Sequence, residues 1–398
     1  MEKKRTRAQD AAKGIMIMIV VAFHSYLMIF PTAGDALTSF NIMMALFPFL
    51  LSTFFFYTGY NYVPNKRTFK ENVLRRAKQL LIPLLLCYVI SILTIGPMEL
   101  IFASINHVDI GATFHSIGNS ILYSLMSEPL AQMIKFPQNG GTLFSFILSL
   151  GLLWFLYCLF ICSIFFYALV NYTNKKLSHL VSVVIILLIG AFCLGEFVGV
   201  YLPYTVQCYP VVLAIMLTAA YLRQNHFLNK RISNKKESIF HAINMIIAEG
   251  IIIGTCFACH YHFGAVLTGS LPGGLFDYSL RGFDALIAFF FSIIGTYFIH
   301  TLCRLIKHVP GLGSFLQWVG NHSSVFYLFH PIFLTFASIV FFQKRYMWGI
   351  GQGFIYLGFS LGMLILTCLI IDLIVKKRKI KHEMVEEIEN NKDPEDNI

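Results

Sequence analysis

The sequence predicts an all-α fold: a polytopic membrane helical bundle of about ten transmembrane helices, with both termini cytoplasmic. Three observations predict it. Of the 398 residues, 57% are hydrophobic and only 13% are charged, which leaves too little polar surface to cover a soluble core. The apolar residues gather in stretches near the length that crosses a membrane. Lys and Arg gather in every second connection between these stretches. A soluble globular protein is therefore excluded.

The apolar stretches follow one another along the chain and are separated by polar connections. An α-helix rises 1.5 Å per residue, so about 20 apolar residues cross a hydrocarbon core of about 30 Å. We expect transmembrane helices at 14–30, 41–62, 80–103, 143–170, 179–195, 205–222, 239–260, 282–303, 322–342 and 349–375.

The positive charges predict the orientation of the chain, because Lys and Arg are retained on the cytoplasmic side of a membrane. An odd number of spans would break the alternation of basic and non-basic connections. The net charge of +10 is explained by this topology and by contact with anionic membrane lipids, so it is no evidence for nucleic-acid binding. With the N-terminus inside, the 30 Lys and Arg fall on the cytoplasmic side except for Lys135, Arg281, Lys344 and Arg345.

The chain divides into a transmembrane domain over 1–375 and a cytoplasmic tail over 376–398, basic at first and then acidic, which we expect to be disordered. No Ala-x-Ala-like site follows the first apolar stretch, so we do not expect cleavage of a signal peptide. The nine cysteines lie in or beside apolar stretches and are expected to be free thiols. The run Cys256–His262 contains metal-ligating residue types, but no second pair lies nearby, so no metal site is predicted.

The ionisable residue of the first apolar stretch is His24. Placing a charged side chain at a bilayer centre costs about 2.5–3.5 kcal/mol or more of free energy. An imidazole there is therefore expected to have a hydrogen-bonding partner or a function. Lys13 lies about three helical turns earlier on the same face, roughly 16 Å away along the axis. This face links a cationic entrance to a buried base. The alternative is a histidine that only forms a hydrogen bond with a neighbouring helix.

A second basic cluster, Arg75, Arg76 and Lys78, lies just before the third apolar stretch, on the same predicted side as Lys13. A ligand with phosphates at one end and a reactive group on a long arm would fit between this cluster and His24. Basic residues beside a membrane also follow from topology and lipid headgroups alone. The cluster therefore indicates an anion site only in combination with the shared face of Lys13 and His24.

Further candidate site residues lie in or near the apolar stretches. Asp10 lies near the face of Lys13 and is expected to orient it. Tyr327 and His330 are three residues apart, so they share a helix face and are candidates for a functional pair. Glu249 is a carboxyl group inside an apolar stretch, where ionisable residues are usually functional or paired with one another.

Several short motifs occur in order along the chain: Asp10–Ile15 with Val20–His24, Phe56–Tyr60, Arg75–Pro83, Trp154–Leu156, and Ser324 with Tyr327–His330. In this order and spacing they resemble the acyltransferase 3 family, multispanning membrane proteins that acylate, usually O-acetylate, cell-surface saccharides and related acceptors. The resemblance covers roughly 10–375 and includes the number of spans. Two positions depart from the family pattern: Lys13 and Gln79 stand where the family commonly has arginine.

The resemblance implies a membrane O-acyltransferase (O-acetyltransferase) that moves an acetyl or longer acyl group from cytosolic acetyl-CoA to a hydroxyl of a cell-surface saccharide or glycopolymer precursor. It implies a multi-pass protein of a bacterial cytoplasmic membrane. Acetyl-CoA would be the donor substrate, and no permanently bound cofactor is expected. A neutral His24 would act as general base on the acceptor hydroxyl. The residues expected to hold the CoA phosphates are Lys13, Arg75, Arg76 and Lys78; Trp154 belongs to the fourth motif.

The residues leave other classes open. A transporter of saccharides or lipid-linked precursors would use buried histidines and Glu249 as proton-relay groups, although secondary transporters often contain inverted repeats with paired broken helices, and no such pairing is evident. A non-catalytic membrane scaffold would tolerate changes at His24. The identity of the acceptor, and a monomer or a homodimer as the working form, are left open by the sequence.

Overall fold

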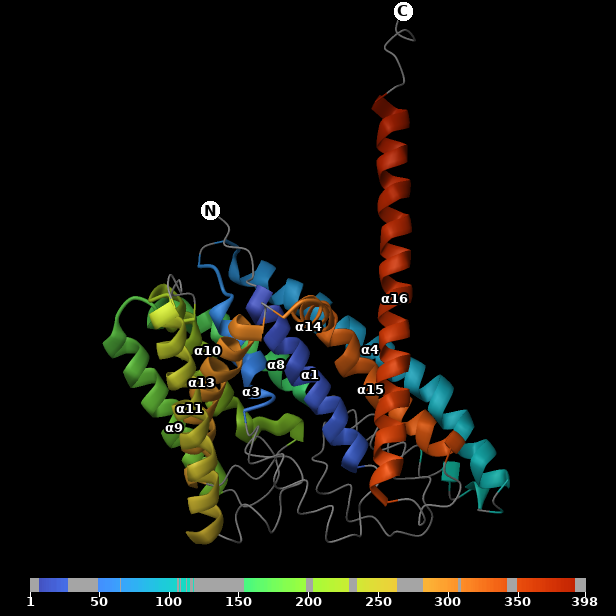
Figure 1. The fold of residues 1–398 in the computed structure, drawn as a ribbon, viewed down its shortest axis with the longest axis horizontal. Helices are drawn as coiled ribbons and strands as arrows, with labels where there is room; N and C mark the ends of the chain where they lie inside the picture. Colours follow the sequence, from blue (N-terminus) through green and yellow to red (C-terminus); the bar gives the residue numbers. More distant parts are fainter. Residues whose placement is uncertain are drawn as a thin grey trace, which may run out of the picture.

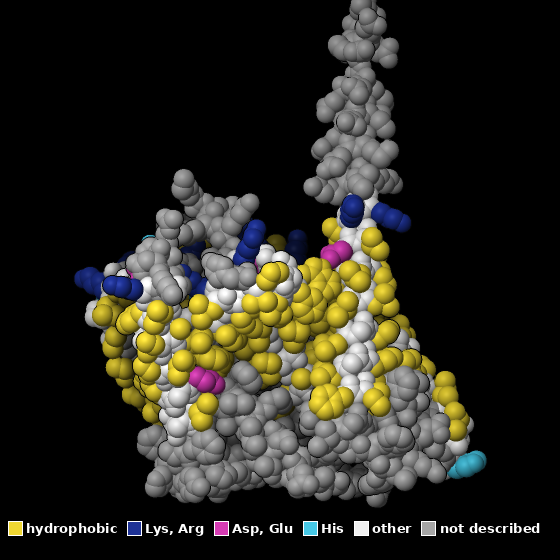
Figure 2. All heavy atoms as spheres, viewed as in Figure 1, with side chains coloured by type: hydrophobic (Ala, Val, Ile, Leu, Met, Phe, Trp, Pro, Cys, Tyr) yellow, Lys and Arg dark blue, Asp and Glu magenta, His cyan; other side chains and the backbone are white. Residues whose placement is uncertain are grey.

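The regular structure of the described residues is entirely helical, as the sequence predicts. The computed structural model describes residues 7–27, 49–64, 66–105, 107, 109–111, 113–114, 117, 154–197, 203–228, 235–262, 282–306, 309–341 and 349–390. Tight packing is confined to the interior. The outer faces of the helices α4 (Phe69–Ile105), α11 (Lys235–His262) and α16 (Gly349–Asn390) carry exposed Ile, Leu and Phe. Figure 2 shows these hydrophobic side chains covering the helices, with Lys and Arg gathered toward one end.

Seven helices in the described part of the chain are long and apolar enough to cross a membrane. They match seven of the apolar stretches expected from the sequence. The longest, α4, contains Pro83 and Pro97. The seven helices are α4 (Phe69–Ile105), α8 (Trp154–Thr173), α9 (Leu177–Phe197), α10 (Tyr209–Gln224), α11 (Lys235–His262), α13 (Gly282–Ile306) and α16 (Gly349–Asn390).

The three remaining expected stretches, at 14–30, 41–62 and 322–342, are represented by α1 (Arg7–Leu27), α3 (Ser52–Tyr60) and α15 (Ser323–Phe341). Parts of these stretches lie outside the described residues, and α1 begins with charged residues. The count of ten spans and the cytoplasmic position of both termini therefore stay predictions. In Figure 1 the start of α1 and the far end of α16 lie at the same end of the bundle.

The tail differs from the sequence prediction. The α16 helix continues beyond the apolar segment and ends at Asn390, so the first part of the tail is helical where disorder is expected from its composition. In Figure 1 this part of α16 extends well beyond the other helices. Residues 391–398 lie outside the described part of the chain.

The α1 helix lies in the interior and contacts α3, α13, α14, α15 and α16. Its closest neighbour is α14 (Leu312–Asn321), a short helix that lies across its first turns. At the crossing, a Cβ on Gly320 would lie 1.6 Å from the carbonyl oxygen of Asp10, and a Cβ on Gly14 would lie 2.1 Å from the carbonyl oxygen of Leu316. The two backbones approach so closely that only glycine fits at these positions.

The α14 helix is in turn tied to α16 by a polar cluster. Nε1 of Trp318 donates to Oδ2 of Asp372 at 2.9 Å, and Nε2 of His322 lies 2.9 Å from Oδ1 of the same carboxylate. A carboxylate that accepts from two side chains fixes both in place. The interhelical contacts thus run from α1 through α14 to α16, and they hold α1 at one position and angle in the bundle.

Candidate active site

His24 and Lys13 both lie on α1, which is helical over the whole interval between them. The His24 side chain is only partly buried, whereas Lys13 is 8% exposed. The sequence predicts a cationic entrance at Lys13. The structure places that ammonium group in the protein interior rather than on an open surface.

His24 lies against a second histidine, His330 of α15. Nδ1 of His24 is 2.9 Å from Nε2 of His330. The ring centroids are 5.0 Å apart and the ring planes differ by 22°, so the two imidazoles meet edge to edge. His330 is completely buried. Its other nitrogen, Nδ1, lies 2.7 Å from the carbonyl oxygen of Tyr327 and 3.1 Å from that of Phe326. These contacts form a continuous line of hydrogen bonds from the backbone of α15 to the ring of His24.

Tyr327 belongs to the same site. Its side chain is buried, and its ring centroid lies 5.8 Å from that of His330 and 5.3 Å from that of Phe155 at the start of α8. The structure therefore brings together three of the residues that the sequence singles out, from helices at opposite ends of the chain: His24, Tyr327 and His330. Trp154 is the first residue of α8, but its side chain lies outside the described part of the structure.

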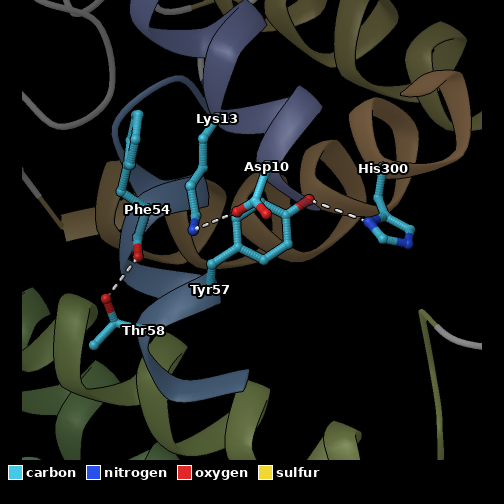
Figure 3. A network of polar contacts seen from close by, with 6 residues as sticks. All are labelled: Asp10, Lys13, Phe54, Tyr57, Thr58 and His300. Carbon is cyan, nitrogen blue, oxygen red and sulfur yellow. Dashed lines mark hydrogen bonds and ion pairs between the residues drawn. The ribbon is translucent and has the colours of Figure 1, made fainter. Parts of the chain in front are cut away.

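A polar network surrounds Lys13 near the first turns of α1 (Figure 3). Nζ of Lys13 lies 3.4 Å from Oδ1 of Asp10, and both side chains are buried. The ammonium group also lies 5.9 Å from the centre of the Tyr57 ring, within reach of a cation–π interaction. The hydroxyl of Tyr57 is 3.3 Å from Nδ1 of His300 on α13. Asp10 thus contacts Lys13 as the sequence suggests.

Tyr57 and His300 complete this network. His300 is one of the ionisable residues that the sequence suggests as cavity-lining groups or as partners for one another, whereas Tyr57 is not predicted as a site residue. The signal available in the sequence is weak: Tyr57 lies in one of the family motifs, and His300 is an ionisable residue in an apolar stretch. Their partners come from helices distant in sequence, so the network becomes visible only in the fold.

The basic cluster before the third apolar stretch lies at the start of α4. Arg75 and Lys78 are exposed, whereas Nε of Arg76 donates to the hydroxyl of Tyr167 on α8 at 3.1 Å. The main contacts of α4 are with α8 and α15. Arg75 and Lys78 are therefore the members of the cluster with exposed side chains, whereas Arg76 is partly buried against α8.

Glu249 lies apart from the histidine pair. It is on α11, which packs against α13, and its buried Oε2 has no hydrogen-bond partner among the described residues. The side chains of Cys256–His262 lie outside the described part of the structure. Within that part, no group of three or more His, Cys, Asp or Glu side chains could hold a metal ion.

The fold and the site define a membrane protein of many helices with paired imidazoles buried between the first helix and a late one. A family model described as "Acyltransferase domain" matches residues 7–375, nearly the whole chain. The chain belongs to the acyltransferase 3 family, as the motifs predict, and it is a membrane acyltransferase. Among curated proteins and among solved structures, none matches this chain.

Proposed function

We propose that this protein is an acyl-CoA-dependent O-acetyltransferase of a bacterial cytoplasmic membrane. It transfers the acetyl group of cytosolic acetyl-CoA to a hydroxyl of a cell-surface saccharide or glycopolymer precursor. The observation that supports it is the histidine pair: His24 lies among apolar helices, and its Nδ1 is hydrogen-bonded to His330. An imidazole in this setting is suited to general base catalysis.

The reaction requires one proton acceptor and one proton donor, and His24 serves as both. Its free nitrogen takes the proton of the acceptor hydroxyl as the oxygen attacks the thioester carbonyl. The tetrahedral adduct then collapses, the carbon–sulfur bond breaks, and the CoA thiolate receives the proton from the His24 imidazolium. The products are the O-acetyl ester and CoA, so no other reactant is needed.

The donor approaches from the end of the bundle that carries the exposed basic residues (Figure 2). Arg75 and Lys78 are placed to bind the CoA phosphates by charge-assisted hydrogen bonds. Lys13 lies farther inside, on the helix that leads to His24. We assign it to the same donor site, as a fixed positive charge held by Asp10 and the Tyr57 ring.

The ammonium group of Lys13 has two roles: it pairs with Asp10 in the fold, and we assign it to the donor site. Lys13→Met, compared with a double variant, separates them. The single substitution leaves the buried Asp10 carboxylate unpaired, which costs about 3–5 kcal/mol of stability. The double variant Asp10→Asn/Lys13→Met removes both charges and should regain most of the thermal stability. We expect its KM for acetyl-CoA to stay about 10- to 100-fold above that of the wild type, because a charge-assisted contact with phosphate is lost. Thermal unfolding in detergent and initial-rate kinetics measure the two effects, and a normal KM in the double variant would remove Lys13 from the donor site.

The proposed function is tested with membrane vesicles that contain the protein, acetyl-CoA labelled in the acetyl group, and an envelope saccharide fraction. We expect base-labile label in the saccharide, and none with vesicles that contain His24→Asn. An inserted, folded wild-type protein that transfers no label would contradict the proposal. A parallel assay uses the saccharide fraction labelled in the sugar, and uptake of that label without acetylation would instead identify a transporter.

A further inference from the structure

The hydrogen bonds of His330 fix which of its nitrogens carries the hydrogen. Nδ1 lies 2.7 Å and 3.1 Å from two carbonyl oxygens, those of Tyr327 and Phe326. A carbonyl oxygen can only accept, so Nδ1 must be the protonated nitrogen. The ring is completely buried, and a positive charge there would be unfavourable without a counter-ion. His330 is therefore a neutral imidazole whose Nε2 has a free lone pair.

Pro331 explains why the carbonyl of Tyr327 is available. In an α-helix that oxygen would accept from the N–H of the residue four positions later, which is position 331. Proline has no N–H, and Pro331 lies inside α15. The side chain of His330 takes the place of the missing backbone donor, at the shorter of its two carbonyl distances. The consecutive histidine and proline thus anchor the imidazole to its own helix.

The state of His330 constrains the state of His24, whose ring also contacts the backbone of Val20 one turn earlier on α1. Nε2 of His330 can only accept, and it lies 2.9 Å from Nδ1 of His24, so Nδ1 of His24 must carry the hydrogen. The lone pair of a neutral His24 is then on Nε2. In each hydrogen bond of this line the donor is on the side of His24: His24 donates to His330, and His330 donates to the backbone of α15. His24 is the partly exposed residue of the pair, and its Nε2 is the nitrogen that His330 does not engage.

We propose that His330 is a positioning residue that holds His24 in the tautomer with Nδ1 protonated and thereby keeps Nε2 ready to accept the proton of the acceptor hydroxyl. This inference rests on the proposed function. When His24 becomes an imidazolium, its Nδ1–H bond to His330 becomes charge-assisted and stronger. The neutral imidazole of His330 thus has the task that a carboxylate has in a Ser-His-Asp triad.

The test compares two replacements of His330. His330→Gln keeps an acceptor oxygen near the position of Nε2, whereas His330→Leu fills a similar volume without an acceptor. We expect His330→Leu to lower kcat by about 10²- to 10⁴-fold with little change in the KM for acetyl-CoA, because the wrong tautomer of the base becomes accessible. His330→Gln should regain activity to within about tenfold of the wild type.

A packing control and a direct measurement complete the experiment. Leu334, also buried in α15, lies one turn from His330. Leu334→Ala should lower thermal stability and leave kcat per folded molecule within about threefold. Solid-state NMR of histidine labelled with ¹³C and ¹⁵N reports the tautomer of His24 independently of activity. Its signal is identified by its absence from His24→Asn. We expect the Nδ1-protonated form in the wild type and in His330→Gln, and a mixture in His330→Leu.

The outcomes separate the two proposals. Wild-type kcat in His330→Leu, equal losses in the Leu and Gln variants, or an unchanged His24 tautomer in His330→Leu would each overturn the role of His330. A tautomer that changes as expected in a protein that transfers no acetyl group would support the positioning role and contradict the proposed function.

Discussion

Replacing His24 with asparagine is expected to reduce acetyl transfer by at least about 10²- to 10⁴-fold, the contribution usually made by a general base. The amide nitrogen of asparagine lies close to the position of Nδ1, so the variant can still donate to Nε2 of His330. It retains no basic nitrogen. Insertion and thermal stability should therefore stay near wild-type values, and the loss should fall on kcat, measured with labelled acetyl-CoA.

The matched control is His179→Asn. His179 lies at the start of α9, where its ring stacks on Tyr172 with centroids 4.4 Å apart, far in sequence from the histidine pair. Because it makes no contact with the site described above, its replacement should leave transfer unchanged. Substantial residual activity in His24→Asn, with the control normal, would exclude His24 as the base.

Gly320→Ala is expected to have the largest effect on the fold. The added Cβ would lie 1.6 Å from the carbonyl oxygen of Asp10 and 3.0 Å from the backbone nitrogen of Gly14. Both neighbours are backbone atoms, so no side-chain rotation relieves the clash, and α1 must move away from α14. Overpacking typically costs about 1–3 kcal/mol, and more where the backbone must shift. The same movement displaces His24 from His330, so activity should fall together with stability.

Gly362→Ala in α16 is the control, because nothing lies within 4 Å of a Cβ added there. Alanine is favoured over glycine in a helix by about 1 kcal/mol, so this variant should be as stable as the wild type or slightly more stable. Thermal unfolding in detergent measures both variants. Equal melting temperatures for Gly320→Ala and the wild type would show that the crossing of α1 and α14 can relax.

Much of the fold is predictable because hydrocarbon selects long apolar helices, and these are visible as uninterrupted stretches in the sequence. The helices α4, α8, α9, α10, α11, α13 and α16 lie where hydropathy places them. The catalytic candidate His24 is similarly visible, because an ionisable residue in an apolar stretch is rare. The extension of α16 to Asn390 is not predictable in this way, since a charged sequence composition is compatible with a helix or with disorder.

The partners of the site residues could not be derived from spacing along one helix. His330, the hydrogen-bond partner of His24, lies 306 residues later in the sequence. The burial of Lys13 depends on Asp10, Tyr57 and the helices packed around them. The close crossing at Gly14 and Gly320 depends on two glycines that look unremarkable in isolation. Periodicity shows which face of a helix is polar, but the identity of the facing helix follows from tertiary packing alone.

The line of hydrogen bonds that begins at His24 ends on amide carbonyl oxygens of α15, which are too weakly basic to pass a proton onward. Under the proposed function, no proton leaves the imidazole pair by that route, and the proton taken from the acceptor hydroxyl returns to the CoA sulfur. We therefore expect acetyl transfer in membrane vesicles to proceed at the same rate with and without an electrochemical gradient.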